Sequence, residues 1–374
     1  MRRILAGGVI ALALTVSVSA FAQSQDENAE LRSRVSELSE KVAELEAQQA
    51  KFRWAEKLAL KGDFRYRFEG IDEAGRDNRD RQRLRTRLMI NADVNDDIRV
   101  GVEISTGGSN PRSRDVTLDG DASAKDISLR RAYVSWQATD RLAVTAGKMP
   151  QPWTRNPVEY FYDSDYMPEG LAVGFANDAG FYGKGYWLQI DERGADDDSS
   201  VWGGEVGYDA GLFYASLGYQ DFRKMDGYNP CFQGNCNGNT VDAAGNLVYD
   251  YNITRLRGGV KLAGFDIFGS WARNGDADED TAYAIGVVYG KVRDPGSWSI
   301  AAAYQDMEKD ALYGGMIDAT FAGGRSAHDG FSVKGTYAIT KNWTGSFIWF
   351  DNSIDKLADE RDYNRYQLDL LFKF

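Results

Sequence analysis

Few side chains in this sequence of 374 residues are suited to catalysis or metal binding. The chain has one histidine, His328, and two cysteines, Cys231 and Cys236. Enzymes that activate a nucleophile or a water molecule usually place a histidine beside it, and only Ser326 lies close to His328 in the sequence. We therefore assign no catalytic residue, no metal site and no cofactor. An enzyme that uses His328 stays open as one alternative.

Arginine is the charged residue whose spacing is most informative. In 65–67 and in 83–87 it recurs at every second position, with other residues between. Such rows could present a basic surface to solutes, or could pair with nearby carboxylates and hold a wall rigid, and we expect both roles. The expected basic set comprises Arg65, Arg67, Arg83, Arg85, Arg87, Arg99 and Arg131. The formal net charge of -12 argues against a nucleic-acid partner, which would need a basic face.

Strands are the elements predicted to position these arginines. Apolar and polar residues alternate with a period of two, which places them on opposite faces of a strand. No apolar run after the N-terminus approaches the roughly 20 residues that a membrane-spanning helix needs. We predict sixteen strands, at approximately 58–69, 81–94, 98–106, 127–138, 142–149, 170–177, 180–190, 200–209, 212–222, 251–262, 265–273, 281–290, 298–306, 331–339, 343–351 and 365–374.

The connections between these segments alternate strictly between long and short. That alternation is typical of an outer-membrane barrel, which has long external loops and short periplasmic turns. The sequence therefore predicts a closed antiparallel transmembrane β-barrel over 57–374, with about 16 strands. Apolar faces would meet the lipid and arginines the lumen, because each arginine turned to lipid near the midplane would cost about 2–4 kcal/mol.

The last predicted strand supports closure. Its apolar residues alternate with polar ones up to the terminal Phe374. A closed barrel accommodates such an ending, because the last strand pairs with the first and leaves no edge. The terminal phenylalanine also looks like the C-terminal signal that outer-membrane assembly machinery recognises, so we expect that machinery as a partner.

The N-terminus predicts export. Arg2 and Arg3 precede an apolar stretch at 4–18, and Ala20 and Ala22 form a cleavage site of the A-x-A type. This pattern predicts a secretory signal peptide at 1–22, and a retained anchor helix is the alternative.

The two cysteines lie five residues apart in a segment rich in asparagine and glycine. Exported proteins occupy compartments in which disulfides persist, and two cysteines alone do not supply the four ligands of a structural metal site. We therefore predict a disulfide between Cys231 and Cys236.

A heptad pattern follows the signal peptide. Its apolar residues are spaced 4, 3, 4, 3, with acidic and basic residues at outer positions, and they are Leu31, Val35, Leu38, Val42 and Leu45. This predicts a short coiled coil in 23–56 that associates with copies of itself, because two to three heptads alone are marginal in water. An amphipathic helix that lies on its own domain is the alternative.

The connection 150–169 differs from the other long loops. It contains four of the seven prolines, several aromatic residues and four acids, Glu159, Asp163, Asp165 and Glu169. We expect this loop to fold into the barrel, to pack its aromatic residues on the wall and to present its carboxylates opposite the arginines. The pore would then be narrowed and crossed by a transverse field. An aromatic girdle at the rim or a subunit contact is the alternative.

Five short segments occur in a distinctive order: KGDFRYRFE at 61–69, RQRLRTRL at 81–88, LRRAYV at 129–134, AGK at 146–148 and DSDYMPEG at 163–170. Together they resemble a family of Gram-negative outer-membrane porins that carry an N-terminal coiled coil. The resemblance implies a diffusion channel and a homotrimer. It implies no particular substrate and no catalytic residue.

We therefore predict a signal peptide at 1–22, a periplasmic coiled coil at 23–56 and a barrel in the Gram-negative outer membrane at 57–374. The expected function is passive diffusion of ions and small hydrophilic solutes. Expected partners are outer-membrane lipid, lipopolysaccharide, further copies of the chain and, through the coiled coil, the cell wall. A structural anchor that tethers the envelope through the coiled coil is the other alternative.

Overall fold

The computed structural model describes residues 28–46, 55–356 and 359–374. The chain divides into two units, 1–58 and 59–374, which are described separately. The predicted signal peptide at 1–22 lies outside the described residues, as do the ends of the predicted coiled-coil segment.

The N-terminal unit contains a helix at 28–46. Two ion pairs between residues four apart, Glu30 with Arg34 and Glu37 with Lys41, support it on its polar side. The five heptad residues from Leu31 to Leu45 are all between 52% and 64% exposed. The helix thus presents an apolar seam that no described residue covers. None of the described helices is long and apolar enough to cross a membrane.

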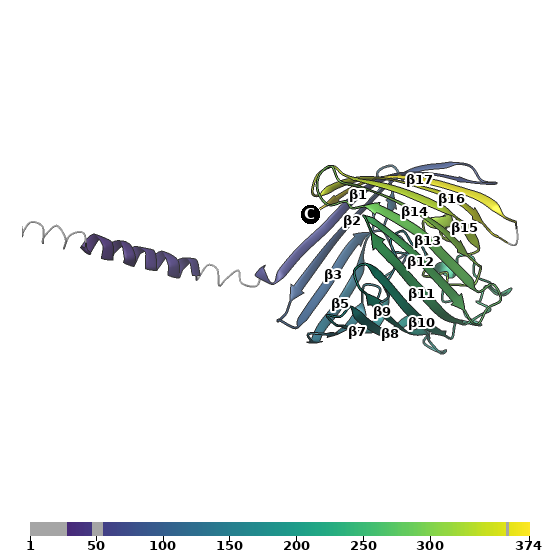
Figure 1. Ribbon diagram of the computed structural model, residues 1–374, viewed down its shortest axis with the longest axis horizontal. Coiled ribbons are helices and arrows are strands. Elements are labelled where there is room, and N and C mark those ends of the chain that lie inside the picture. Colours follow the sequence, from purple (N-terminus) through teal and green to yellow (C-terminus); the bar gives the residue numbers. More distant parts are fainter. Residues whose placement is uncertain (1–27, 47–54, 357–358) are drawn as a thin grey trace, which may run out of the picture. The chain divides into compact units, whose positions relative to one another are not determined.

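The second unit is built almost entirely from antiparallel strands (Figure 1). They are β1 (Leu58–Glu73), β2 (Arg79–Asp93), β3 (Ile98–Thr106), β4 (Val116–Thr117), β5 (Ile127–Thr139), β6 (Leu142–Lys148), β7 (Glu169–Ala176), β8 (Phe181–Asp191), β9 (Ser199–Asp209), β10 (Phe213–Arg223), β11 (Tyr251–Leu262), β12 (Phe265–Asn274), β13 (Thr281–Gly290), β14 (Trp298–Met307), β15 (His328–Ala338), β16 (Trp343–Ile354) and β17 (Arg361–Lys373). Two short 3₁₀ turns, Phe232–Gly234 and Phe321–Gly324, lie in long loops.

The sheet closes on itself into a barrel. β1 pairs with β17 from Asp63↔Lys373 to Glu73↔Tyr363, and it also pairs with β2. Gly62 and Phe374 exchange two backbone hydrogen bonds, of 2.9 and 3.0 Å, at the end of this seam. The predicted closed antiparallel barrel of sixteen strands is confirmed, with the two-residue β4 as an addition.

The additional strand β4 completes the pairing of β2. β3 pairs with β2 only from Arg87 to Asp93, whereas β4 pairs with Arg83 and Leu84. The long connection between β3 and β5 therefore returns to the wall and supplies the backbone partners that β3 does not reach. No alternating run marks a two-residue strand, so the sequence did not predict it.

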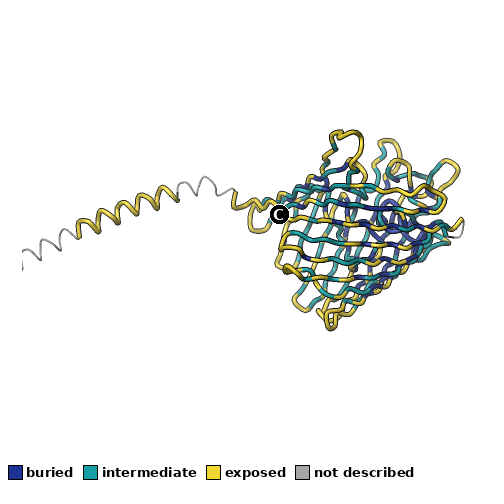
Figure 2. The backbone as a smooth tube through the Cα atoms, turned by 90° about the horizontal axis from the view of Figure 1, so that it is seen from above, coloured by how far each residue is buried: buried dark blue, intermediate teal, exposed yellow. Residues whose placement is uncertain are grey.

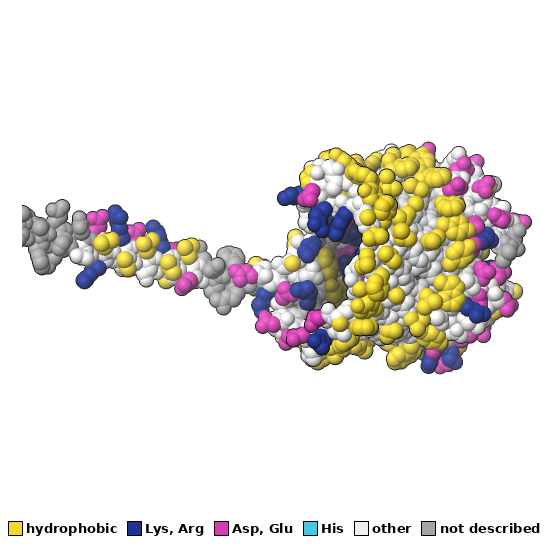
Figure 3. All heavy atoms as spheres, viewed as in Figure 1, with side chains coloured by type: hydrophobic (Ala, Val, Ile, Leu, Met, Phe, Trp, Pro, Cys, Tyr) yellow, Lys and Arg dark blue, Asp and Glu magenta, His cyan; other side chains and the backbone are white. Residues whose placement is uncertain are grey.

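The two faces of the sheet differ as the alternation predicts. Outward positions carry large apolar side chains, for example Leu368, Ile285 and Phe64, and Figure 3 shows such side chains spread in a broad band over the strands. Buried residues gather in the half of the barrel away from residue 374, as Figure 2 shows. Long loops fold into that half, which is called the long-loop end below. The opposite end is the short-turn end.

Strand boundaries match the sequence-based prediction within a few residues. The largest differences lie at the long-loop end, where β15 begins at His328, β16 extends to Ile354 and β17 begins at Arg361. These extensions carry polar residues such as Asp329, Asn352 and Asp362, so the alternation of apolar residues that marks the rest of each strand is lost there.

Replacing Leu368 by arginine tests whether the outward face of the sheet meets lipid. Leu368 is 50% exposed on the outward face in the middle of β17, so L368R should lower the free energy of unfolding by about 2–4 kcal/mol. Urea unfolding in lipid vesicles measures this loss. Leu368→Ala is the control and should cost less, because it adds no charge. Equal losses in the two variants would contradict an outward, lipid-facing position.

Candidate functional site in the barrel lumen

The arginines singled out in the sequence form a basic wall over the first strands. Strand alternation turns Arg65 and Arg67 of β1 inward, together with the three arginines of β2 at 83, 85 and 87. Arg131 lies on the inward face of β5. Arg99, at the start of β3, is 59% exposed at the short-turn end and pairs with Asp93, so it belongs to the rim rather than to the wall.

Each of these arginines has a carboxylate partner. The pairs are Arg65–Asp115 (2.6 Å), Arg67–Asp369 (2.6 Å), Arg83–Glu69 (3.4 Å), Arg85–Asp63 (2.9 Å), Arg87–Asp63 (2.6 Å), Arg99–Asp93 (2.6 Å) and Arg131–Glu103. Glu69, which is fully buried, also binds Arg365 at 2.5 Å. Of the two roles expected for the arginines, the ion pairs that stiffen the wall are thus directly visible.

Asp115 is a wall component that the sequence did not indicate. It lies next to β4 in the connection between β3 and β5, and its carboxylate lies 2.6, 3.5 and 3.8 Å from Arg65, Arg67 and Arg83. Burial alone would raise its pKa, but these positive charges outweigh burial and hold the pKa of Asp115 well below its usual range. Asp115 is therefore an ionised bridge between two strands.

Arg130 is a second component that alternation alone misses. The register between β3 and β5 shifts at Glu103, so Arg130 becomes the extra residue of a β-bulge. The bulge turns both Arg130 and Arg131 toward Glu103, and the Arg130–Glu103 distance is 2.6 Å. Two consecutive arginines before a strand interior were the only trace of this feature in the sequence.

The connection between β6 and β7 folds into the lumen and reaches the wall opposite the arginines. The backbone N–H of Thr154 donates to Glu205 on β9 at 3.1 Å, and Arg255 on β11 donates to the Thr154 carbonyl at 2.6 Å. Arg255 also binds Glu205 at 2.9 Å. Glu205 and Arg255 thus hold the loop at Thr154 against this wall, which is called the far wall below.

Aromatic residues of the loop pack against the wall and against a second loop. Trp153 lies between Tyr162 and Tyr186, with ring centroids 5.1 and 5.8 Å away. Tyr160 stacks on Phe321 at 5.0 Å. Burial raises the pKa of Tyr162 to about 12, although the positive charge of Arg255 acts in the opposite direction. Phe161 has no exposed surface. The aromatic side chains of the loop are thus packed against protein and are not exposed to solvent.

The four predicted loop acids occupy different surroundings. Glu159 reaches the far wall, where it accepts from Ser270 and lies 3.8 Å from Arg255. Asp165 faces the basic wall, 3.1 Å from Arg130 and 3.7 Å from Arg87. Burial would raise the pKa of Asp165, but the arginine charges prevail and lower it.

Asp163 lies between Glu159 and Asp165 in the sequence, and its side chain reaches the loop between β14 and β15. Its carboxylate accepts from the backbone N–H of Ala319 at 2.8 Å, next to the half-buried Asp318 in the sequence. Burial and the neighbouring charges of Asp318 and Asp165 raise the pKa of Asp163, and burial also raises that of Asp318. Neither carboxyl has an ion-pair partner within 4.0 Å in the described part of the chain.

Glu169 departs from the prediction. It is the first residue of β7, its side chain is 61% exposed, and it pairs with Lys148 at 2.6 Å. The strand begins one residue earlier than expected, so Glu169 belongs to the barrel wall and does not face the arginines across the pore.

Two further loops enter the long-loop end, which the sequence did not indicate. The segment between β14 and β15 buries Leu312, Met316 and Ile317 against the wall. Its backbone carbonyls at 317 and 324 accept from Arg112, at 3.2 and 3.0 Å. Interlocked loops therefore fill much of this end of the barrel.

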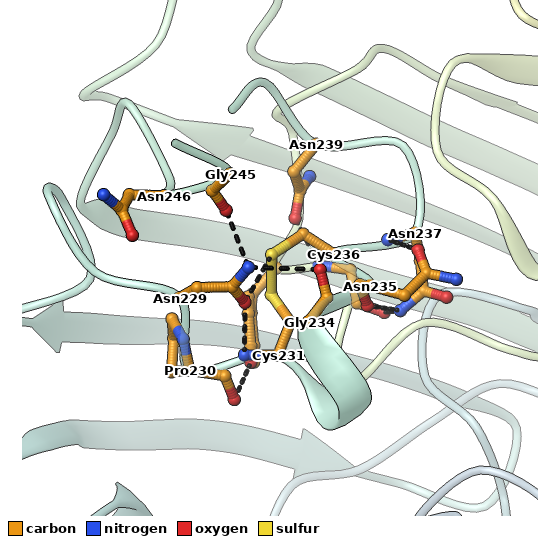
Figure 4. Close-up of a disulfide and its surroundings, with 12 residues drawn as sticks. Asn229, Pro230, Cys231, Gly234, Asn235, Cys236, Asn237, Asn239, Gly245 and Asn246 are labelled. Carbon is orange, nitrogen blue, oxygen red and sulfur yellow. Dashed lines mark hydrogen bonds between the residues drawn. A yellow bond between two sulfur atoms is a disulfide. The ribbon is translucent and has the colours of Figure 1, made fainter. Parts of the chain in front are cut away.

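The connection between β10 and β11 carries the disulfide, which joins Cys231 and Cys236 (Figure 4). Asn229 braces this small ring, since its side-chain N–H groups donate to the carbonyls of Gly234 and Gly245. Asn239 in the same connection donates to the carbonyl of Leu312 at 3.0 Å, which ties the two loops together. No cluster of three metal-binding side chains occurs among the described residues.

His328 has both ring nitrogens engaged. Its Nδ1 lies 2.6 Å from the carbonyl of Arg325, which can only accept, so this nitrogen donates. Its Nε2 lies 2.9 Å from Gln305 Nε2 and therefore accepts. The ring is buried, and a neutral histidine with both nitrogens occupied has no free lone pair to serve as a base.

Cavities remain on both sides of the loop between β6 and β7. One, of about 580 Å³, is lined by Gln151, Arg155 and Asn156 from the loop and by β10–β12 of the wall. Another, of about 620 Å³, opens among the long loops near Arg112, Tyr166 and Asp191. Figure 3 shows basic side chains gathered in the hollow at one end of the barrel. The lumen is thus narrowed and polar.

The fold is shared with solved outer-membrane barrels. Pseudomonas putida OprB covers 87% of this chain and 96% of its own, with 13% identity and a TM-score of 0.59. A triple mutant of the Rhodopseudomonas blastica porin covers 85% of this chain and 100% of its own, with 14% identity and a TM-score of 0.52. A loop-deletion mutant of OmpT from Vibrio cholerae gives the same four values. The chain therefore shares the fold of outer-membrane β-barrels.

Two family models match parts of the sequence, and both describe porins. Residues 72–187 match the family described as "Putative porin", and residues 170–345 match the family described as "Gram-negative porin". Together the two models support a Gram-negative outer-membrane porin family for this chain. No curated protein matches it. Families and barrel neighbours together support an outer-membrane channel for passive solute diffusion, and they give no support to a structural anchor or a barrel enzyme.

The raised pKa values of Asp163 and Asp318 lead to a prediction about pH. Both pKa values lie above the ordinary 3.8 in the folded state, so the folded protein binds more protons than the unfolded chain above about pH 4, and stability falls as the pH rises. Asp318→Asn keeps the Oδ1 that accepts from Thr320 and Phe321 but removes the charge. Between about pH 4 and 8, the melting temperature of this variant should fall less than that of the wild type.

Asp178→Asn is the matched control, because the Asp178 side chain is fully exposed. Its melting temperature should follow the wild-type dependence on pH. The assignment would be wrong if Asp318→Asn also followed the wild-type curve.

Proposed function

We propose that the loop between β6 and β7 is the constriction of this channel and that it sets which solutes pass. The observation that carries the proposal is the span of the loop across the lumen. At one side Asp165 contacts Arg130 and Arg87, and at the other Thr154 is clasped by Glu205 and Arg255. A solute that moves through the lumen must pass this element, which is fixed at both walls.

The charges at this level favour polar solutes. Paired guanidinium and carboxylate groups keep a local field in a wet, narrow lumen, although water and salt screen it over longer distances. Such a field orders dipolar solutes and disfavours apolar ones. We therefore propose ions and small hydrophilic solutes as the cargo. The proposed channel is not an enzyme, and the occupied nitrogens of His328 support this.

We further propose a homotrimer in which the N-terminal helices associate in the periplasm. The exposed heptad seam supports association, because a lone helix of this length with an uncovered apolar stripe is marginal in water. Removal of a signal peptide at 1–22, contact with lipopolysaccharide and recognition of Phe374 by assembly machinery belong to the same proposal, as does contact between the helices and the cell wall.

Deletion of residues 156–166 tests the constriction. Single-channel conductance in planar bilayers should rise at least twofold, because the deletion removes the packed part of the loop from the lumen. Heat-modifiable migration on a denaturing gel checks that the barrel is closed. Unchanged conductance in a closed barrel would refute the constriction.

A second variant avoids the truncation. Glu205→Gln and Arg255→Gln remove the charges that hold Thr154, and Glu159→Gln is added because Glu159 lies 3.8 Å from Arg255 and would otherwise be left as an unpaired buried charge. This variant should show larger current fluctuations and faster proteolysis within the loop than the wild type. Lys341→Gln, at the turn between β15 and β16, is the control and should match the wild type.

Deletion of residues 24–52 tests the role of the helix. The mass of the detergent-solubilised complex should fall from three chains to one, while conductance per barrel stays the same. A trimer that persists without the helix would show that barrel contacts alone hold the copies together. Lost envelope integrity with normal permeability would instead favour a tether.

A further inference from the structure

The cations of the far wall differ from those of the basic wall. Every arginine of the basic wall has a carboxylate within 4.0 Å, whereas Arg257 of β11 and Arg155 of the loop have none among the described residues. The Nε of Arg257 is buried and has no hydrogen-bond partner. Within the described part of the chain, Arg155 donates to the carbonyl of Tyr162 alone, at 2.6 Å, which leaves most of its N–H groups without a protein acceptor there. Their charges are therefore available to a ligand.

These two arginines line one cavity, of about 580 Å³, together with Lys261. The cavity lies near the short-turn end. Lys261 and Asp266 are paired residues of β11 and β12, close to the short turn at Gly264 that joins these two strands. Gln151 and Asn156 contribute amide groups from the loop. The cavity thus combines three cations with neutral hydrogen-bonding groups.

Tyr214 fixes the geometry of the wall side. The Arg257 guanidinium lies 4.3 Å and the Lys261 ammonium 4.8 Å from the centroid of its ring. Its hydroxyl donates to Asp266 at 3.0 Å, so the ring cannot turn away. Gly259 makes room for it, because a Cβ there would lie 2.5 Å from the Tyr214 ring. Two cations are thus held on one aromatic side chain.

Negative charge in the cavity is sparse. Asp266 lines it but already accepts from Tyr214. Lys261 lies 3.7 Å from Asp209, and both side chains are more than 40% exposed, so that pair is weak. Positive charge is unpaired here, in contrast to the basic wall, where every arginine lies within 4.0 Å of a carboxylate.

We propose that this cavity binds small oxyanions with two charges, of which inorganic phosphate is the simplest. Guanidinium groups match phosphate oxygens in pairs of parallel hydrogen bonds, and a partly enclosed site weakens the competition from water. A cavity of about 580 Å³ also admits a small organic phosphate or dicarboxylate. The inference rests on the proposed channel and adds a saturable binding site on the short-turn side of its constriction.

The test is a titration with phosphate in planar bilayers. The full-length protein conducts in potassium chloride at pH 8, and inorganic phosphate is added stepwise. Phosphate should reduce the chloride current with a saturable dependence on its concentration. Arg257→Gln should raise the half-saturating concentration about tenfold, and Arg257→Lys should raise it less, because lysine keeps the charge but loses the planar fork.

Lys334→Gln is the matched control. Lys334 is an inward cation of β15 that also lacks a carboxylate within 4.0 Å in the described part of the chain, but it does not line the cavity. Its half-saturating concentration should change less than twofold. Equal shifts in Lys334→Gln and Arg257→Gln would overturn the site in favour of a diffuse field.

Two further outcomes separate the inference from the function on which it rests. Normal chloride conductance without saturable phosphate inhibition would overturn the oxyanion site and leave the channel intact. Absence of any conductance in a closed, correctly migrating barrel would overturn the channel itself. A succinate titration distinguishes the two ligand sources, since a site that prefers phosphate should saturate at a lower phosphate concentration.

Discussion

The pairing of every backbone N–H and C=O group in an apolar surrounding is the constraint on which this structure depends. Lipid offers no hydrogen bonds, so a sheet within it must close. β1 and β17 meet along eleven residue pairs, and β4 returns to fill the part of β2 that β3 leaves unpaired. Closure in turn fixes the two faces, because a period of two then separates residues in contact with lipid from residues that enclose water.

Closure creates a second requirement inside the lumen. Several charged side chains are buried on the inner face of the wall, and an unpaired buried charge is costly. The basic wall meets this requirement with acids from four separate segments: Asp63 and Glu69 of β1, Glu103 of β3, Asp115 beside β4 and Asp369 of β17. The same need attaches the constriction loop, whose Asp165 completes the surroundings of Arg130.

Periodicity predicted the barrel almost entirely, because the pattern of each strand is local. It also predicted that the arginines of β1 and β2 face inward, although Arg99 lies at the rim. The composition of 150–169 indicated that this loop is unlike the others. What it missed depends on register or on contacts distant in sequence. Arg130 turns inward only because of a bulge, and Asp115 meets Arg65 across fifty residues. The inward folding of the loop between β14 and β15 left no compositional trace, since its burial depends on the loops that pack around it.

Selectivity in such a lumen depends on unpaired charges more than on the number of charges. An arginine that is bound at 2.6 Å to a carboxylate presents a dipole to a passing ion, whereas Arg257 presents a net charge. A sequence rich in arginine on its first strands can therefore have those arginines paired with carboxylates and carry unpaired arginines elsewhere. The paired wall contacts the proposed constriction through Asp165, and in our proposal the few unpaired cations beneath it provide the attraction for anions. Rigidity and attraction are thus assigned to opposite walls of one barrel.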